Sequence, residues 1–220
     1  DTRLDVAAAS ISNRSDYRPR IAAAFGEAAS INRYQLLSAL TSYVVSLRSF
    51  NSPFDRYVRG ETPRLDPLAR QGFNLFMGKA ACGTCHFAPT FAGLVPPLYR
   101  ESESEVLGVM QSPDSTRLDA DPGRSRNGRQ EDRITLYERA FKTTTVRNVE
   151  LTAPYFHNGA YRTLDEVIDF YDKGGARGMG ASDVPNQTLS EEPLQLSDKE
   201  KQALKRFLLS LTDRWHAIRH

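Results

Sequence analysis

The two cysteines of this 220-residue chain lie three positions apart, and a histidine directly follows the second one. The stretch reads Cys82-Gly83-Thr84-Cys85-His86, which is the pattern that attaches c-type haem. Two thiols on one turn of chain can each form a thioether with a porphyrin vinyl group. The histidine that follows can then bind the iron as its proximal ligand. The stretch therefore predicts a core that wraps one covalently bound haem.

Three other readings of the same residues are weaker. A thioredoxin-like redox pair also has the spacing C-x-x-C, but it normally sits in a βαβ context, and the sequence shows none. A structural zinc site needs four ligands, whereas Cys82, Cys85 and His86 supply three and the other histidines lack finger spacing. A plain disulfide remains open, although it would leave the adjacent histidine without a role.

Composition limits the classes of protein that the chain can belong to. Apolar residues make up 40% and charged residues 25% of the sequence, and the net charge is +2. This balance argues against a nucleic-acid partner. No run of 18 apolar residues predicts a membrane span. The chain opens on Asp1 without an apolar leader. Because haem is attached to this pattern outside the bacterial cytoplasm, we expect a periplasmic protein whose signal peptide is absent here.

The first third of the chain shows two helical segments before an irregular one. Residues 18–29 have helical composition, and residues 33–48 repeat apolar side chains at spacings of three and four. Asn32 and Gln35 have the spacing of a helix-start capping box. Residues 50–57 contain a proline and two aromatic rings, and we predict a packed connection there.

The segment before the haem stretch and the last third of the chain have clearer helix signals. Asp66-Pro67 predicts a helix start, and Gly78 predicts the end of that helix four residues before Cys82. Capping-box patterns at residues 163–166 and 197–200 begin two further helices. Their apolar stripes are Leu164, Val167, Ile168 and Tyr171 in the first helix, and Ala203, Leu204, Phe207, Leu208 and Leu211 in the second.

These segments together predict an all-α fold of the c-type cytochrome kind. Several helices wrap one covalently bound haem, and long irregular loops connect them. We assign residues 1–17 to a linker or N-terminal tail, residues 18–212 to the haem domain, and residues 213–220 to a C-terminal tail.

Three stretches of the sequence resemble one family. Residues 50–57 (FNSPFDRY), 78–86 (GKAACGTCH) and 141–171 (FKTTTVRNVELTAPYFHNGAYRTLDEVIDFY) look like the C-terminal, electron-relay haem domain of bacterial dihaem cytochrome c peroxidases and the related MauG-type enzymes. The similarity covers residues 18–212, and the block that begins at Phe141 is its most specific part. The chain departs from the family at Thr144, where a proline is usual.

The resemblance implies a second axial ligand for the haem iron. In the peroxidases the position fourteen after the histidine of the Y-F-H block is a methionine ligand, and in MauG-type enzymes it is a tyrosine. Counting from His157, this position is Tyr171, which the helical stripe independently places inside. Met179 in its glycine-rich stretch is the alternative ligand, and an open iron with Tyr171 as a core residue is the third possibility.

The resemblance also implies roles for four residues near the haem. His157 is expected to hydrogen-bond or pack beside the haem. Arg147 is expected to pair with a haem propionate, since a guanidinium binds a carboxylate through two hydrogen bonds, with a surface arginine as the alternative. Thr152 and Pro154 match positions whose backbone carbonyls bind calcium between the two haems of the family.

The function implied is that of an electron-relay part of a cytochrome-c peroxidase-like oxidoreductase. The peroxide-reacting haem would lie in an N-terminal haem domain that this chain lacks. The expected partners are that domain, hydrogen peroxide, and a small electron donor (a cytochrome c or a cupredoxin) or a protein substrate. A stand-alone mono-haem electron carrier is the alternative.

Overall fold

The structure is a computed structural model that describes residues 2–26 and 30–214. The chain divides into two compact units, unit 1 at Asp1–Arg48 and unit 2 at Ser49–His220. The boundary therefore lies at 48/49, whereas the sequence predicted one domain that begins at residue 18. The haem stretch and most of the residues that resemble the family belong to unit 2.

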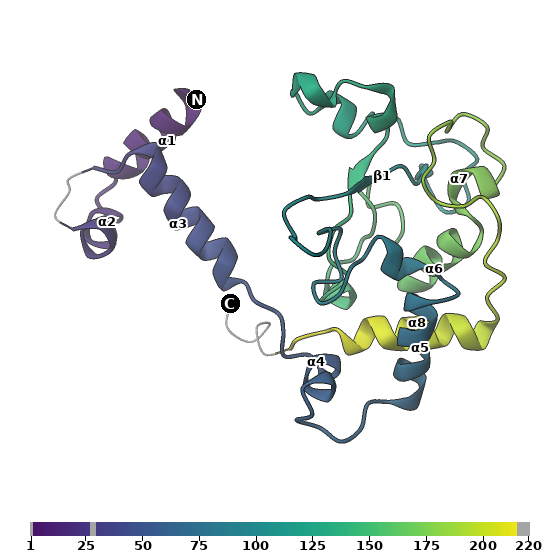
Figure 1. The fold of residues 1–220 in the computed structure, drawn as a ribbon. Helices are drawn as coiled ribbons and strands as arrows, with labels where there is room; N and C mark the ends of the chain where they lie inside the picture. Colours follow the sequence, from purple (N-terminus) through teal and green to yellow (C-terminus); the bar gives the residue numbers. More distant parts are fainter. Residues whose placement is uncertain (1, 27–29, 215–220) are drawn as a thin grey trace. The chain divides into compact units, whose positions relative to one another are not determined.

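Unit 1 is a small helical cluster, drawn in purple and dark blue in Figure 1. Its helices are α1 (Thr2–Ser12), α2 (Arg18–Phe25) and α3 (Arg33–Ser46). The prediction of a tail over residues 1–17 is wrong for α1. Its alanine-rich sequence favours a helix, and Ala8 is buried with Ile21, Ile31 and Leu36. The buried Ser12 hydroxyl also accepts a hydrogen bond from the backbone N–H of Ile31 at 3.0 Å.

Helix α3 begins where the sequence predicted, because Asn32 and Gln35 form the expected capping box. Its apolar stripe is not buried as a whole, however. Leu36 is buried, whereas the larger part of the stripe is exposed to solvent. The exposed apolar side chains of α3 and its C-cap are Tyr34, Leu37, Leu40, Tyr43, Val44, Val45 and Leu47.

Over the described residues 49–214, unit 2 is built on five helices and a set of long loops (Figure 1). The helices are α4 (Pro53–Val58), α5 (Pro67–Met77), α6 (Leu164–Asp172), α7 (Gly175–Gly178) and α8 (Asp198–Ser210). The predicted starts of α5, α6 and α8 are confirmed, each with its expected cap. Helix α4 replaces the predicted irregular connection, because Ser52 and Asp55 form a capping box around Pro53.

The prediction of a mostly helical fold is confirmed, and the structure adds one short pair of strands. Strands β1 (Ser104–Glu105) and β2 (Phe141–Lys142) pair antiparallel, with Glu105 opposite Phe141. The rest of residues 99–163 is loop with single turns of 3-10 helix. Among the described ranges, no helix is both long and apolar enough to cross a membrane.

The core of unit 2 lies where α5 crosses α8 (Figure 1). The crossing is close because Gly72 has no side chain: a Cβ there would lie 1.9 Å from the backbone oxygen of Ala203. Aromatic rings fill the space around the crossing at centroid distances between 5.1 and 5.9 Å. These rings belong to Phe54, Phe73, Phe76, Phe91 and Phe207.

The predicted C-terminal tail falls mostly outside the described residues, which end at Arg214. Its first residue, Asp213, belongs to the packed part of unit 2. Asp213 is buried, its backbone N–H donates to Asn148 Oδ1 at 2.7 Å, and its carboxylate accepts from the backbone N–H of Asn51. The ordered part of unit 2 therefore extends beyond the predicted boundary at residue 212.

Candidate functional site

The haem stretch forms a tight turn directly after α5. A 3-10 helix covers Cys82–Thr84, and the backbone N–H of His86 donates to the carbonyl of Cys82 at 2.9 Å. Both thiols are free and partly buried. Burial raises the pKa of Cys82 to about 12 and also raises that of Cys85. One turn of the chain thus carries two neutral thiols and an imidazole, as covalent haem attachment requires.

The imidazole of His86 is held through one ring nitrogen. Its Nδ1 lies 3.2 Å from the carbonyl oxygen of Phe91. Because a carbonyl can only accept, Nδ1 carries the proton in this contact and Nε2 has the lone pair that can bind a metal. Burial lowers the pKa of His86 although the carbonyls of Phe91 and Thr144 oppose this shift, which keeps the ring in the neutral form that a ligand needs.

Tyr171 lies in the last turn of α6 and turns toward the same region. Burial raises the pKa of its phenol, and electrostatic interaction with the thiols of Cys82 and Cys85 raises it further. Its ring packs against Phe156 and Phe170. Within the described part of the chain the hydroxyl makes no hydrogen bond. It is therefore free to meet a ligand.

Met179 and His157 lie around this region in different ways. Met179 follows α7 and packs into the same apolar cluster as Tyr171, which leaves its role as the alternative ligand a prediction. His157 stacks on the ring of Phe141, with centroids 3.6 Å apart, and its Nε2 lies 3.1 Å from Asp119 Oδ1. The side chain is thus hydrogen-bonded and packed, and its predicted role beside the haem stays a prediction.

Arg147 does not have the role that the resemblance implied. The side chain is buried, and its guanidinium binds both carboxylate oxygens of Asp55 at 2.9 Å. The remaining N–H groups donate to the carbonyls of Pro89 and Ser49. With its donors occupied, Arg147 has none left for a haem propionate, so this prediction is corrected. The alternative of a surface arginine is wrong as well.

The two residues predicted to bind calcium lie in an exposed turn. Thr152 caps a short 3-10 helix, Val149–Leu151, and its hydroxyl donates to the carbonyl of Val149. The peptide bond before Pro154 is cis. Nothing in this geometry tests the carbonyls of Thr152 and Pro154 as ligands, and the calcium site stays a prediction.

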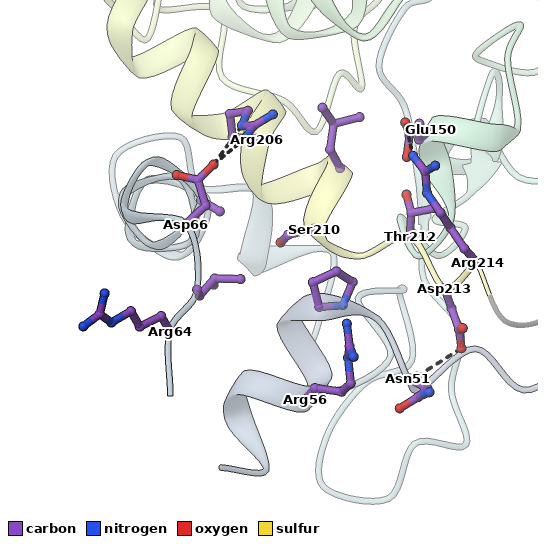
Figure 2. A pocket seen from close by; sticks show the side chains of 14 residues that line it. Asn51, Arg56, Arg64, Asp66, Glu150, Arg206, Ser210, Thr212, Asp213 and Arg214 are labelled. Carbon is purple, nitrogen blue, oxygen red and sulfur yellow. Dashed lines mark hydrogen bonds and ion pairs between the residues drawn. The ribbon is translucent and has the colours of Figure 1, made fainter. Parts of the chain in front are cut away.

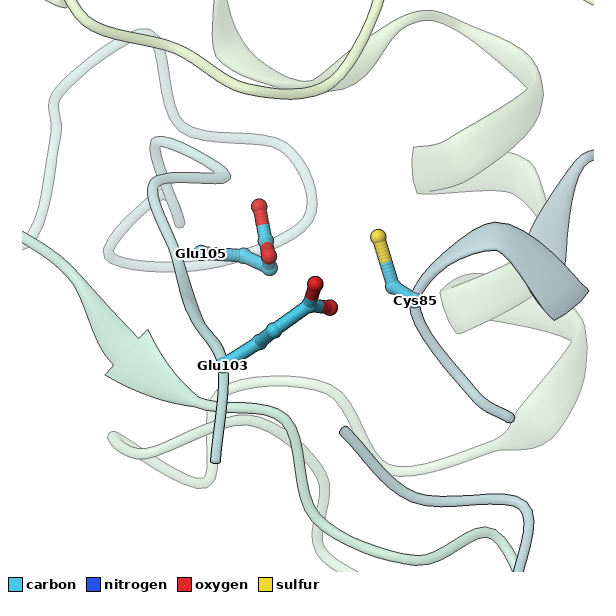
Figure 3. Close-up of side chains that lie close together, drawn as sticks. All are labelled: Cys85, Glu103 and Glu105. Carbon is cyan, nitrogen blue, oxygen red and sulfur yellow. The ribbon is translucent and has the colours of Figure 1, made fainter. Parts of the chain in front are cut away.

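Two glutamates beside Cys85 were not found by sequence reasoning. Figure 3 shows Glu103 and Glu105 pointing toward the thiol, and the ligand atoms of the three residues lie within 4.8 Å of one another. Burial and the neighbouring Glu105 raise the pKa of Glu103, and one of its oxygens is buried without a partner among the described residues. The signal available in the sequence was the alternation of glutamates at 101, 103 and 105, which resembled a solvated loop.

A cavity of unit 2 lies elsewhere. It measures about 560 Å³, and Figure 2 shows it between α4, the start of α5 and the end of α8. Arg206 pairs with Asp66 at 2.6 Å, and Arg214 lies 3.6 Å from Glu150. No residue of the haem stretch or of α6 lines it. We regard it as a solvated groove separate from the haem region.

The residues around Cys82 fit a c-type haem. The stretch from Cys82 to His86 supplies two unbridged thiols and an imidazole whose Nδ1 donates to a carbonyl, and Tyr171 on α6 supplies a phenol without a hydrogen-bond partner among the described residues. The unpartnered buried oxygen of Glu103 lies at the same place. When bound, a haem would supply an iron that gains and loses one electron, while the chain supplies its attachment and its axial ligands.

Comparisons with known proteins give a consistent result. The family model described as di-haem cytochrome c peroxidase matches residues 1–63. The cytochrome-c peroxidase IdrP2 of Pseudomonas sp. (strain SCT) is 34% identical over 194 residues, covering 83% of this chain and 50% of IdrP2. The methylamine utilization protein MauG of Methylorubrum extorquens is 29% identical, covering 89% of this chain and 49% of MauG.

A similar result comes from solved structures. A MauG-like protein associated with microbial copper homeostasis has a TM-score of 0.69 and 27% sequence identity, over 97% of this chain and 63% of that protein. The chain spans about half the length of the curated relatives it matches.

Proposed function

Because the chain belongs to the family of di-haem cytochrome c peroxidases and MauG-type enzymes, we propose that it is the electron-relay haem domain of such an oxidoreductase. One haem c is attached through Cys82 and Cys85, and His86 is its proximal ligand. The observation that carries the proposal is the contact of His86 Nδ1 with the Phe91 carbonyl, which leaves Nε2 ready for iron beside two free thiols.

Tyr171 is the proposed distal ligand. Its side chain is partly buried in an apolar cluster, its phenol interacts electrostatically with both thiols, and its hydroxyl has no competing hydrogen bond within the described residues. A phenolate stabilises ferric iron and lowers the reduction potential, whereas a methionine raises it. Tyr171 therefore favours a MauG-like relay over one tuned for ordinary peroxide reduction. Met179 is the alternative ligand, since it packs in the same apolar cluster.

The second haem of the family has no attachment stretch in this sequence, so we propose that it belongs to a domain that the sequence does not include. That domain would react with hydrogen peroxide and exchange electrons with the haem at Cys82. The exposed apolar side chains of α3 support this proposal, because a large exposed apolar patch commonly marks an interface. The residues that the family model matches, 1–63, include α3.

Surface labelling of tyrosines tests the role of α3. In a longer chain that contains the second haem domain, Tyr34 and Tyr43 should be protected from a tyrosine-modifying reagent; in the present chain both are exposed. Equal modification in the two chains would contradict this docking surface.

The remaining parts of the proposal follow from the family. A small cytochrome c or a cupredoxin donates electrons, or a protein substrate does so. The site of action is the periplasm. A calcium ion bound by the carbonyls of Thr152 and Pro154 would lie between the haem domains and need a further ligand from the missing domain.

An optical spectrum combined with an intact-mass measurement tests the central claim. The expected result is one covalent haem per chain, with a ferric spectrum typical of oxygen and nitrogen axial ligands. A mass without haem after expression with a haem-attachment system would overturn the proposal.

A stand-alone mono-haem electron carrier is the second candidate, and the single C-x-x-C-H favours it. The coding sequence upstream of Asp1 distinguishes the two. A second C-x-x-C-H there supports the two-haem enzyme, and a signal peptide alone supports the carrier.

A further inference from the structure

Residues 145–147 bind the loop that follows the haem stretch. Their donors reach the carbonyls of three consecutive loop residues, 89–91, so that this part of the loop is fixed residue by residue. The contacts are Arg147 Nη2 to Pro89 at 2.7 Å, Thr145 Oγ1 to Thr90 at 2.6 Å, and the Val146 N–H to Phe91 at 2.9 Å.

The third carbonyl of this loop is also the partner of the proximal histidine. Phe91 O accepts from Val146 N and from His86 Nδ1. Its direction depends on the left-handed backbone of Phe91, which has φ of +48°, a conformation that is unfavourable for a bulky residue. Because the Phe91 ring is buried among the aromatic rings of the core, packing and the bonds from residues 145–147 must hold this conformation together.

Asp55 fixes Arg147 in turn. Burial alone would raise the pKa of Asp55, but hydrogen bonds from Arg147 and Ser52 outweigh it and lower the pKa, so the pair is ionised. The Ser52 hydroxyl and backbone N–H both donate to Asp55 Oδ2. The carboxylate is thus anchored at the start of α4, and the guanidinium is held flat between Asp55 and Pro89 O.

We propose that Arg147 and Asp55 are positioning residues for the haem iron: they fix the 89–91 loop so that the Phe91 carbonyl binds His86 Nδ1, and they thereby set the reduction potential. The inference rests on the proposed function, because it requires the haem at Cys82. Neither residue is among the predicted ligands of the iron. Their influence passes through the loop and one hydrogen bond.

The direction of the effect follows from the chemistry of imidazole. A hydrogen bond from Nδ1 makes the imidazole a stronger electron donor, and a stronger donor favours ferric over ferrous iron. Loosening the loop weakens the bond and raises the potential. Loss of a group that orients a metal ligand in this way typically lowers metal affinity or activity by about tenfold or more. We expect a change of similar size in the ferric–ferrous equilibrium. A tenfold change in the ferric–ferrous equilibrium corresponds to about 59 mV for one electron.

The test uses the full haem-loaded chain and four variants, which are Arg147→Gln, Arg147→Lys, Thr145→Val and Arg206→Gln. Arg147→Gln removes the fork that holds Pro89 O, but it leaves a buried carboxylate unpaired and can impair folding. Thr145→Val keeps the pair, and because this side chain is exposed, its loss should be tolerated. It removes two hydrogen bonds of the Thr145 hydroxyl, the one donated to the Thr90 carbonyl and the one accepted from the Arg147 backbone N–H. Arg206→Gln is the matched control, since it breaks an arginine–aspartate pair that lies outside the haem region and joins α8 to Asp66 at the start of α5.

Two readouts respond to the proximal bond and not to packing in general. These are the reduction potential and the iron–histidine stretching frequency of the ferrous protein with Tyr171→Phe as background. Arg147→Gln should raise the potential by the equivalent of about tenfold and lower the frequency. Thr145→Val should shift both in the same direction by less, Arg147→Lys should restore part of the shift, and Arg206→Gln should change neither.

The outcomes separate this inference from the proposed function. A wild-type chain that attaches no haem overturns the proposed function. A wild-type chain with normal haem, together with unchanged potential and frequency in Thr145→Val and in any folded Arg147→Gln, overturns the inference alone. Equal shifts in the Arg206→Gln control would do the same, because they would show a general loosening.

Discussion

Gly72 predicts a large response to the smallest possible substitution. In Gly72→Ala the new Cβ would lie 1.9 Å from the Ala203 backbone oxygen and 2.8 Å from Phe207 Cβ. Carbon atoms in contact keep about 3.5 Å apart. Since the nearest atom belongs to the backbone of α8 and not to a flexible side chain, the two helices must move apart.

Two opposing effects set the size of the change. Alanine is better than glycine inside a helix by about 0.5–1 kcal/mol. Overpacking a core costs about 1–3 kcal/mol, and occasionally more; a clash with backbone belongs at the upper end. The net expectation is a loss of about 2 kcal/mol in the free energy of unfolding of unit 2. For a domain of this size it lowers Tm by about 4–8 °C.

Thermal unfolding followed by circular dichroism and by haem absorbance measures this loss. Gln71→Ala is the control, since residue 71 is exposed on the same helix, and its Tm should stay within about 2 °C of the wild type. An unchanged or higher Tm for Gly72→Ala would refute the reasoning, because helix propensity would then outweigh the α5–α8 contact.

Two further predictions concern the ligand and the acid stability. Tyr171→Phe should move the ferric spectrum toward high spin and Tyr171→Met should raise the reduction potential; an unchanged spectrum in both would remove Tyr171 from the iron. Hydrogen bonds from Lys79 and from the Ser197 backbone lower the pKa of Glu200 from 4.5 to about 2. The stabilisation is therefore complete above pH 4.5 and is lost as the pH falls through about 2. Glu200→Gln keeps the cap and should flatten acid unfolding between these values, whereas the same pH profile as wild type would speak against the Lys79–Glu200 pair.

Local signals in the sequence were sufficient for the starts of α3, α5, α6 and α8. The caps at Asn32, Asp66, Thr163 and Ser197 each depend on residues within one turn, so their patterns can be read from the chain. The stripe of α8 is buried as predicted, because α5 covers it.

Periodicity did not reveal what covers an apolar face. The stripe of α3 has the same spacing as that of α8, yet Leu40 and Val44 are half or more exposed. The pattern shows that a face is apolar and says nothing about its partner. In a chain that spans about half of its relatives, the partner can lie outside the sequence.

Long-range partners were equally beyond the sequence. The resemblance drew attention to Arg147. The carboxylate partner of Arg147 is Asp55, which lies 92 positions away, and no local pattern connects the two residues. Glu103 and Glu105 meet Cys85 only because β1 pairs with β2 and the loop folds back.

The acceptor that His86 uses is a main-chain oxygen, which every residue type carries. Replacing Phe91 does not delete that oxygen, but it removes packing that helps to hold the carbonyl in its direction. Sensitivity is shared with the side chains that hold the loop, at Thr145 and Arg147. A mutational scan of this region would thus register a packing defect at position 91 and a redox defect more than fifty residues further along the chain, although both changes act on one hydrogen bond.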